Sequence, residues 1–225
     1  MAKKRLYLAS SNQHKRKEMQ QILPDYEIRI PNDDGIEFNP TENGSSFYEN
    51  SLIKARALWE LVHEPVIADD SGICVEALGG EPGIFTSRYA GPNFMHGKPD
   101  GSKISQDEQN RFLIEQLNDS KSENRNCHYT CAMVLLLNPD RFFVAQETFE
   151  GTLINSIEEQ AGTGGTFLVP SRERTGGFRG STAYAPDVYG VCGGVGHRTR
   201  LYGVEQHTAH APREDGVSCH APRAG

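Results

Sequence analysis

The 225-residue sequence lacks features that mark several common protein classes. Its longest apolar run, Ala132–Leu137, is far shorter than the ~20 residues that a membrane-spanning helix needs. The basic start at Lys3 is followed by only a few apolar residues before Ser10, so no secretion signal is expected. The five cysteines contain no CxxC pair, which disfavours a zinc site or a disulfide framework. These absences predict a cytoplasmic protein with no membrane partner.

Basic residues are also few. The chain has 23 Lys and Arg against 30 Asp and Glu, a formal net charge of −7. Because phosphate backbones are bound by basic surfaces, this balance argues against a nucleic-acid polymer as partner. A small phosphorylated ligand stays open, since a few placed cations and a metal ion can bind it. The hydrophobic content of 36% is enough to bury a core.

Residues 1–170 alternate between strand and helix patterns, which predicts one α/β domain around a twisted sheet. One predicted helix begins with a capping box, because Ser46 is followed three residues later by Glu49. The expected strands are Leu6–Ala9, Val66–Ala68, His128–Leu137 and Phe142–Phe149, and the expected helices are Gln13–Leu23, Phe47–His63 and Asp107–Leu117.

Residues 171–225 differ in composition and are expected to form a divergent, mostly irregular tail. From Gly176 onward, fifty residues include ten glycines and one leucine, with no isoleucine and no lysine. Side chains of this kind bury too little surface to offset the entropy of ordering the chain. No helix or strand pattern can be traced there.

The first candidate site is the polar loop between the first strand and the first helix, Ser10-Ser11-Asn12-Gln13-His14-Lys15. Backbone N–H groups at a helix start, together with hydroxyls and a lysine, can cradle a phosphate. The alternative interpretation is a helix cap beside a solvated lysine.

The second candidate is Asp69-Asp70-Ser71-Gly72, predicted at the end of a buried strand. Adjacent carboxylates there need a metal ion, hydrogen bonds or water. Because successive strand side chains point to opposite faces, one aspartate is expected to face a cleft and the other to be structural. The alternative is an ordinary Asp-Ser-Gly turn.

The third candidate is Glu42, just before the capped helix, with Asn50 and Lys54 four residues apart on that helix. An acid, an amide and an ammonium could then surround one ligand, although a solvated helix face would show the same pattern. Together the three stretches supply phosphate donors, cations and metal-binding carboxylates, which favours hydrolysis or transfer at a phosphate.

These stretches resemble the inosine triphosphate pyrophosphatase family, which hydrolyses noncanonical purine nucleoside triphosphates. Family members share a T/S-x-N-x-x-K loop, matched by Ser10–Lys15, and an E-x-G-x-[ST]-F-x-E-N-A-x-x-K-A-R stretch, matched by Glu42–Arg56. The family's A-D-D-S-G string, with its later P-G and S-A-R-Y elements, is similar to Ala68–Gly91. The resemblance continues to Gly165 and covers about three quarters of the chain.

The resemblance implies an elongated mixed twisted sheet with flanking helices, two lobes around a central cleft, and a homodimer. It implies that Ser10–Lys15 and Lys54 bind the triphosphate and that Ser71 contacts the substrate. Glu42 and Asp70 would hold Mg²⁺, and Asp70 would also be the general base. The implied reaction splits the bond between the α- and β-phosphates of ITP, dITP or XTP, giving the nucleoside monophosphate and pyrophosphate.

The chain departs from the family after Gly165. It continues directly with Thr166-Phe167-Leu168, so five residues of the family's F-G-Y-D-P region, which contact the base, are missing. The family's S-H-R triplet has only the pair His197-Arg198 as a counterpart here. One hypothesis is a reading-frame disturbance near residues 165–175. Two alternatives stay open: a nucleotide-binding or decayed protein with little activity, and a Maf-like pyrophosphatase.

Overall fold

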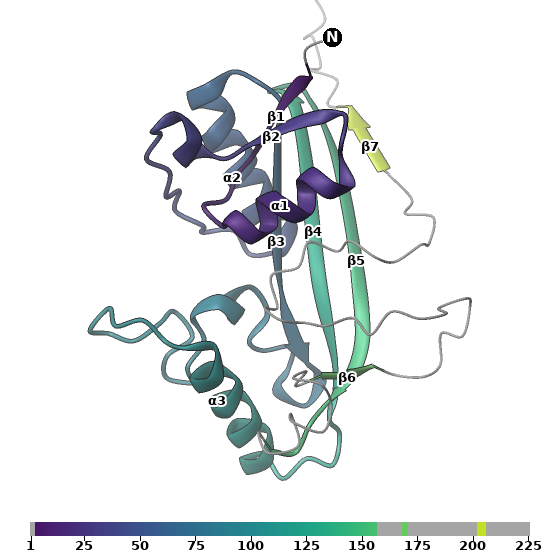
Figure 1. The fold of residues 1–225 in the computed structure, drawn as a ribbon. Coiled ribbons are helices and arrows are strands. Elements are labelled where there is room, and N and C mark those ends of the chain that lie inside the picture. Colours follow the sequence, from purple (N-terminus) through teal and green to yellow (C-terminus); the bar gives the residue numbers. More distant parts are fainter. Residues whose placement is uncertain (1–2, 157–167, 171–201, 206–225) are drawn as a thin grey trace, which may run out of the picture.

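The computed structural model describes residues 3–156, 168–170 and 202–205 (Figure 1). Its strands form one mixed sheet in the order β2-β1-β3-β4-β5-β6, and β7 pairs with β5. β1 is parallel to β2 and β3, whereas β3, β4, β5 and the two short strands pair antiparallel. The strands are β1 Lys4–Leu8, β2 Tyr26–Arg29, β3 Val66–Val75, β4 Asn126–Asn138, β5 Arg141–Leu153, β6 Leu168–Pro170 and β7 Tyr202–Glu205.

Helices at the two ends of the long strands give the molecule two lobes (Figure 1). The upper lobe holds α1 (Gln13–Ile22) and α2 (Phe47–Val62), and the lower lobe holds α3 (Gln106–Asp119). Short 3₁₀ helices lie between them in the chain: η1 Pro31–Asp34, η2 Glu76–Leu78 and η3 Gly83–Arg88. The expected α/β class with an elongated mixed sheet and two lobes is confirmed.

β3 is longer than the sequence predicted. It does not end at Ala68 but pairs with β4 without interruption from Val66 opposite Leu136 to Val75 opposite Cys127. Asp69, Asp70 and Ser71 therefore lie inside a strand, so neither the predicted strand end nor the alternative of an Asp-Ser-Gly turn is correct. The physical reason is that the backbone N–H and C=O groups of this segment pair with β4, and its polar side chains form hydrogen bonds and ion pairs with other side chains.

Three apolar clusters pack on the sheet and fix its faces. Ala55 and Leu58 of α2 pack with Val66 and Ala68, whereas Met19 of α1 packs with Ile67 on the other face. The third cluster joins Ile73 and Val75 to α3. Since β3 alternates without a break, α1 and α3 cover the face that carries Asp69, and α2 covers the face that carries Asp70.

The start of α2 follows the predicted capping box in one of its two contacts. The Ser46 hydroxyl accepts from the Glu49 N–H at 3.2 Å. The Glu49 carboxylate, however, accepts from the N–H and the hydroxyl of Ser45 rather than from Ser46. At the other end, His63 caps the helix with a positive φ of 51°.

Within the tail, which is expected to be mostly irregular, Tyr202–Glu205 forms a short strand, β7, against Arg141–Val144 of β5. A strand that pairs with an exposed strand edge through its backbone needs no large aliphatic side chains. The composition of the tail therefore did not indicate β7. The junction at Gly165, the remainder of the tail, and His197 and Arg198 lie outside the described residues. Within the described parts, every helix is too short or too polar to cross a membrane.

Candidate active site

Four polar side chains meet on the α2 face of β3. The Lys54 ammonium lies 3.2 Å from Asp70 Oδ1 and 3.2 Å from Glu42 Oε2, so it bridges the two carboxylates. Asn50 Nδ2 donates to the other oxygen of Asp70 at 3.2 Å. Asn50 and Lys54 are one helical turn apart on α2, which directs both toward the same carboxylate. The structure thus brings the second and third candidate stretches together at Asp70.

Burial and charge set the protonation of this cluster. Burial is the largest influence on the pKa of Asp70 and raises it; the Lys54 ammonium lowers it and the Glu42 carboxylate raises it, so that the pKa lies above its ordinary value. Burial lowers the pKa of Lys54, but the charges of Asp70, Glu42 and Asp69 outweigh burial and raise it. A carboxylate with a raised pKa beside a permanent cation suits proton transfer.

The opposite face of β3 carries a second ion pair. Lys15 Nζ lies 2.6 Å from Asp69 Oδ2, and both residues are buried. The two aspartates have different partners from different helices, as alternation along the strand predicted. The alternative of a solvated lysine is wrong, because the Lys15 side chain is covered and paired. Ser71 shares this face, and its hydroxyl accepts from the Tyr129 hydroxyl at 3.2 Å.

The predicted site residues are therefore divided between two faces of one strand, but they share an open edge. β1 pairs with β3 only at Val66 and Ile67, because β1 ends at Leu8. Beside Asp69, Asp70 and Ser71, none of the described strands pairs with that edge of β3. The chain leaves β1 there as the polar loop that begins at Ser10, since Ala9 N–H still donates to the Ile67 carbonyl. A ligand at this edge could contact residues of both faces.

The loop from Ser10 to Lys15 is organised as a helix start. Asn12 is the N-cap of α1, and its Oδ1 accepts from the N–H groups of His14 at 2.8 Å and Lys15 at 3.4 Å. Ser10 Oγ accepts from the Asn12 N–H at 3.1 Å. Ser11, Gln13 and His14 are exposed. The cap occupies two of the N–H groups expected to bind phosphate, so exposed side chains remain the accessible donors.

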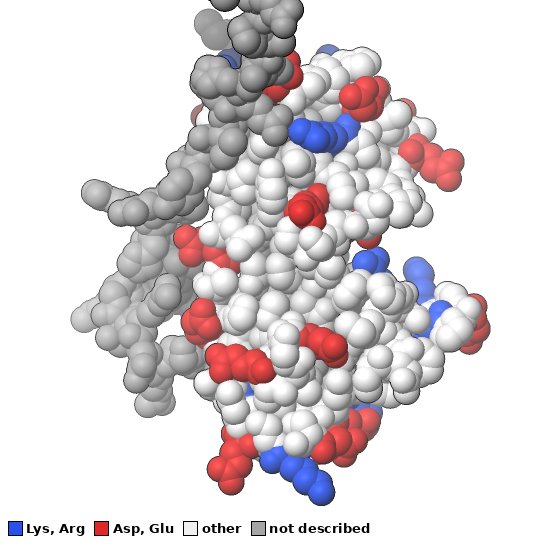
Figure 2. All heavy atoms as spheres, turned by 180° about the vertical axis from the view of Figure 1, so that it is seen from behind, with Lys and Arg blue, Asp and Glu red and all other residues white. Residues whose placement is uncertain are grey.

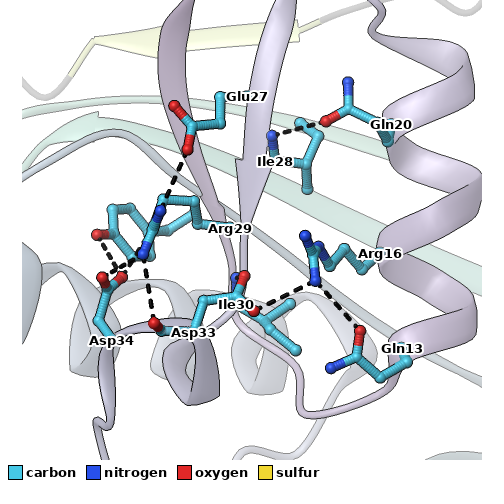
Figure 3. Close-up of polar contacts among 10 residues, drawn as sticks. Gln13, Arg16, Gln20, Glu27, Ile28, Arg29, Ile30, Asp33 and Asp34 are labelled. Atoms are coloured by element: carbon cyan, nitrogen blue, oxygen red, sulfur yellow. Dashed lines mark hydrogen bonds and ion pairs between the residues drawn. The ribbon is translucent and has the colours of Figure 1, made fainter.

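Gln13 belongs to a polar network of the upper lobe (Figure 3). Arg16 donates to Gln13 Oε1 at 3.3 Å and to Asp33 Oδ1 at 3.2 Å. Asp33 in turn accepts from the Ile30 N–H at 3.0 Å. Arg29 donates through Nε to Asp34 Oδ2 at 3.0 Å. These contacts tie the start of α1 to η1 and hold the candidate loop against the lobe.

One charged residue was not singled out as a site residue. Arg88, at the end of η3, has a buried Nε without a hydrogen-bond partner in the described structure. Its guanidinium lies over the Phe85 ring, 5.4 Å from the centroid. η3 packs against the Asp70 face of β3, because a Cβ on Gly72 would lie 2.4 Å from both the Gly83 carbonyl and Thr86 Oγ1. The sequence shows the Ser87-Arg88-Tyr89 string, but it could not show that Arg88 Nε lacks a hydrogen-bond partner.

The carboxylates fit a weakly held hard metal ion better than a structural one. The described residues contain no group of three or more His, Cys, Asp or Glu arranged for a metal. Glu42 and Asp70 are two carboxylates that both form an ion pair with the Lys54 ammonium. Mg²⁺ is commonly bound by one or two carboxylates, with phosphate oxygens and water completing the shell. This donor set therefore fits Mg²⁺ that arrives with a phosphorylated ligand.

The face of the molecule drawn in Figure 2 lacks the basic surface that a nucleic-acid polymer would bind. Figure 2 shows acidic and basic groups scattered over the visible face, with no continuous basic area. On the side away from the grey atoms, the outline is indented between the two lobes. A nucleic-acid duplex would require a basic stripe.

Sequence comparisons identify related proteins. The family model described as the Ham1 family matches residues 6–177. A protein of Treponema denticola named dITP/XTP pyrophosphatase is 42% identical over 161 residues, covering 72% of this chain and 77% of its own length. A Leptospira interrogans protein of the same name is 37% identical, with 70% of this chain and 73% of its own length covered. The chain spans 61% of a Treponema pallidum relative, which is 36% identical over 173 residues and 76% of this chain.

Solved structures are similar as well. A HAM1 protein from Coxiella burnetii is 31% identical, with a TM-score of 0.59, over 68% of this chain and 74% of that one. A protein from Mycobacterium abscessus described as a nucleoside-triphosphatase and dITP/XTP pyrophosphatase is 26% identical, with a TM-score of 0.60, over 76% and 85% of the two chains.

Proposed function

The chain belongs to the Ham1 family, and from this premise we propose that it hydrolyses noncanonical purine nucleoside triphosphates, ITP, dITP and XTP, to the monophosphate and pyrophosphate. Relatives named dITP/XTP pyrophosphatase support this substrate class. The observation that carries the proposal is the meeting of Glu42, Lys54 and Asp70 within 3.2 Å contacts beside an open strand edge. Residues 1–170 are the proposed catalytic domain.

In the proposed mechanism Asp70 is the general base. Its carboxylate accepts a proton from a water molecule whose oxygen forms a bond to the α-phosphorus, while the bond from that phosphorus to the α–β bridging oxygen breaks and pyrophosphate leaves with this oxygen. Asn50 and Lys54 contact the two oxygens of this carboxylate and hold its orientation. Burial raises the pKa of Asp70, which makes its carboxylate a stronger base toward the attacking water.

Cations of both lobes would bind the triphosphate. Lys54 contacts both carboxylates. Its ammonium would therefore also donate to a phosphate that binds beside them. Ser10–Lys15 and Ser71 lie at the same open edge and supply donors from the other face. Arg88, at the end of η3, has a buried Nε without a hydrogen-bond partner in the described structure, and a phosphate is the kind of group that would satisfy it.

Glu42 and Asp70 are the residues that would hold Mg²⁺. When bound, Mg²⁺ neutralises phosphate charge and lowers the pKa of a coordinated water. We also propose that the protein is cytoplasmic and homodimeric, as the family resemblance implies.

A pyrophosphate-release assay with ITP, dITP and XTP, with and without MgCl₂, tests this function. We expect metal-dependent release of one pyrophosphate per monophosphate, and none from the Asp70→Asn variant. If ITP with Mg²⁺ raises the melting temperature but no pyrophosphate is released, the chain binds nucleotides without hydrolysing them. That outcome would favour the decayed-enzyme alternative.

A further inference from the structure

Asn50 is a fully buried polar side chain whose two ends contact two different parts of the candidate site. It is only 1% exposed. Its Nδ2 donates to Asp70 Oδ2 at 3.2 Å, and its Oδ1 accepts from the Gly44 N–H at 2.9 Å. Gly44 is two residues after Glu42, so one amide links the loop that carries Glu42 to the strand that carries Asp70.

The loop approaches Asn50 too closely for any other residue at position 44. A Cβ built on Gly44 would lie 2.8 Å from Asn50 Oδ1 and 2.7 Å from the Glu49 Cβ. Real Cβ atoms do not come this close to other heavy atoms. The hydrogen bond between the Gly44 N–H and Asn50 therefore depends on glycine at position 44. The glycine and the asparagine thus act as one contact.

The helix that carries Asn50 is itself fixed at the level of Asp70. The hydroxyl of Ser51, which is also fully buried, donates to the Ala132 carbonyl at 2.7 Å. Ala132 is the residue of β4 directly opposite Asp70. Ser51 therefore anchors α2 to the sheet without contacting either carboxylate.

We propose that Asn50 is a positioning residue that sets the separation of Glu42 and Asp70, so that both carboxylates can bind the same cation. This inference rests on the proposed function for its activity readout, but it concerns the two carboxylates themselves. Lys54 already bridges them. An ammonium on a flexible stem tolerates many separations, whereas the buried Asn50 amide, held at both ends by hydrogen bonds, permits only one.

The test compares Asn50→Leu with Ser51→Ala as matched control, since both remove a buried polar contact of α2. Each variant is measured for melting temperature, kcat, KM, the MgCl₂ concentration for half-maximal activity, and binding of Mn²⁺ alone by electron paramagnetic resonance. For Asn50→Leu we expect kcat to fall ~10²-fold, as for a misplaced catalytic group. We expect Mg²⁺ and Mn²⁺ requirements to rise ~10-fold or more, as for loss of a contact that orients a metal ligand. KM should change less than about threefold, because Asn50 contacts no proposed phosphate donor.

Ser51→Ala should lower the melting temperature while kcat and the metal requirement stay within about threefold of the unaltered chain. Gly44→Ala is the second variant, used especially if Asn50→Leu does not fold. It breaks the loop contact from the other side and should raise the metal requirement in the same way.

Metal requirements and kcat of Asn50→Leu and Gly44→Ala within threefold of the unaltered chain would overturn the inference and leave the proposed function standing. If the unaltered chain hydrolyses no nucleotide, Mn²⁺ binding decides: weaker binding in Asn50→Leu supports the positioning role although the function fails. Absence of Mn²⁺ binding in the unaltered, inactive chain, both without and with ITP, would overturn both proposals.

Discussion

At the scale of single residues, the two adjacent aspartates of β3 have opposite surroundings. Asp70 is held by an amide and shares an ammonium with Glu42, at the open edge of the strand. Asp69 is buried against one lysine on the other face. We therefore expect the aspartate at position 70 to serve the reaction and the one at position 69 to serve stability.

Asp70→Asn should abolish pyrophosphate release and leave the fold intact. A neutral amide cannot accept the proton of the attacking water and is a poorer ligand for Mg²⁺. Pyrophosphate release and the melting temperature, measured on the same preparation, check this. Retained turnover in Asp70→Asn with loss of turnover in a well-folded Asp69→Asn would reverse the two assignments.

Asp69→Asn should act mainly on stability. It removes the carboxylate charge that lies 2.6 Å from the buried Lys15 ammonium, and breaking a buried pair from one side costs about 3–5 kcal/mol. The free energy of unfolding from denaturant titration measures this loss. In the double variant Lys15→Met with Asp69→Leu, most of the loss should be recovered, because apolar side chains of similar size can replace a buried pair. A double variant less stable than Asp69→Asn would contradict this account.

Lys15 was predicted from sequence to bind phosphate, and its contact with Asp69 changes how that is tested. Lys15→Ala is expected to weaken triphosphate binding by ten- to a hundredfold, since a charge-assisted contact contributes ~1.5–3 kcal/mol. The same substitution also destabilises the fold. The dissociation constant must therefore be measured well below the melting temperature of the variant, and an unchanged constant would leave Lys15 a purely structural role.

At the scale of elements, α3 and the segment after η3 are joined by Tyr89. Its ring lies in the core cluster of the lower lobe, and its hydroxyl donates to Gln116 of α3. Burial, followed by the nearby Glu81 charge, raises the pKa of Tyr89 to about 12 from 10.0. The folded protein therefore favours the neutral phenol.

This shift predicts a loss of stability in alkali. Below pH 10 the contribution of Tyr89 is complete; between pH 10 and about 12 the unfolded chain loses the proton and the folded chain keeps it, so the free energy of unfolding falls. The loss is on the order of 3 kcal/mol. Tyr89→Phe should have a shallower decline over this range, measured by urea unfolding at fixed temperature. Parallel declines in both proteins would assign the loss to other groups.

At the scale of the whole molecule, the residues proposed to bind phosphate and metal lie within residues 10–88, whereas the family resemblance implies that residues after Gly165 recognise the base. If the altered sequence there no longer supplies donors for the six-position oxygen, ITP and ATP should be hydrolysed within about tenfold of each other. A site with such donors can discriminate by ~10⁴-fold.

Rates with both nucleotides, for the full chain and for a chain truncated after Pro170, test this prediction. Truncation should change activity little, although it removes β7 and so exposes the edge of β5 at Arg141–Val144. A strong preference for ITP that disappears on truncation would show that the tail, through His197 and Arg198 or other residues, recognises the base.

Local patterns were sufficient for most elements but not for their lengths. The N-cap of α2, for example, follows from Ser46 and Glu49, which are close together in the sequence. The extent of β3 could not be predicted, because Asp69-Asp70-Ser71-Gly72 has the composition of a turn. Pairing with β4, a strand far away in the chain, overrides that composition.

By itself, the sequence determined the α/β class, the family and the residue types of the site, because hydrophobic period, capping residues and long shared motifs are local properties. It also determined that Asp69 and Asp70 face opposite ways, since alternation is inherent in a strand. Only the tertiary structure decided their partners. Lys15 reaches Asp69 because α1 packs on one face of the sheet, and Asn50 and Lys54 reach Asp70 because α2 packs on the other. That choice depends on which apolar clusters form across the whole sheet, a property of no single segment.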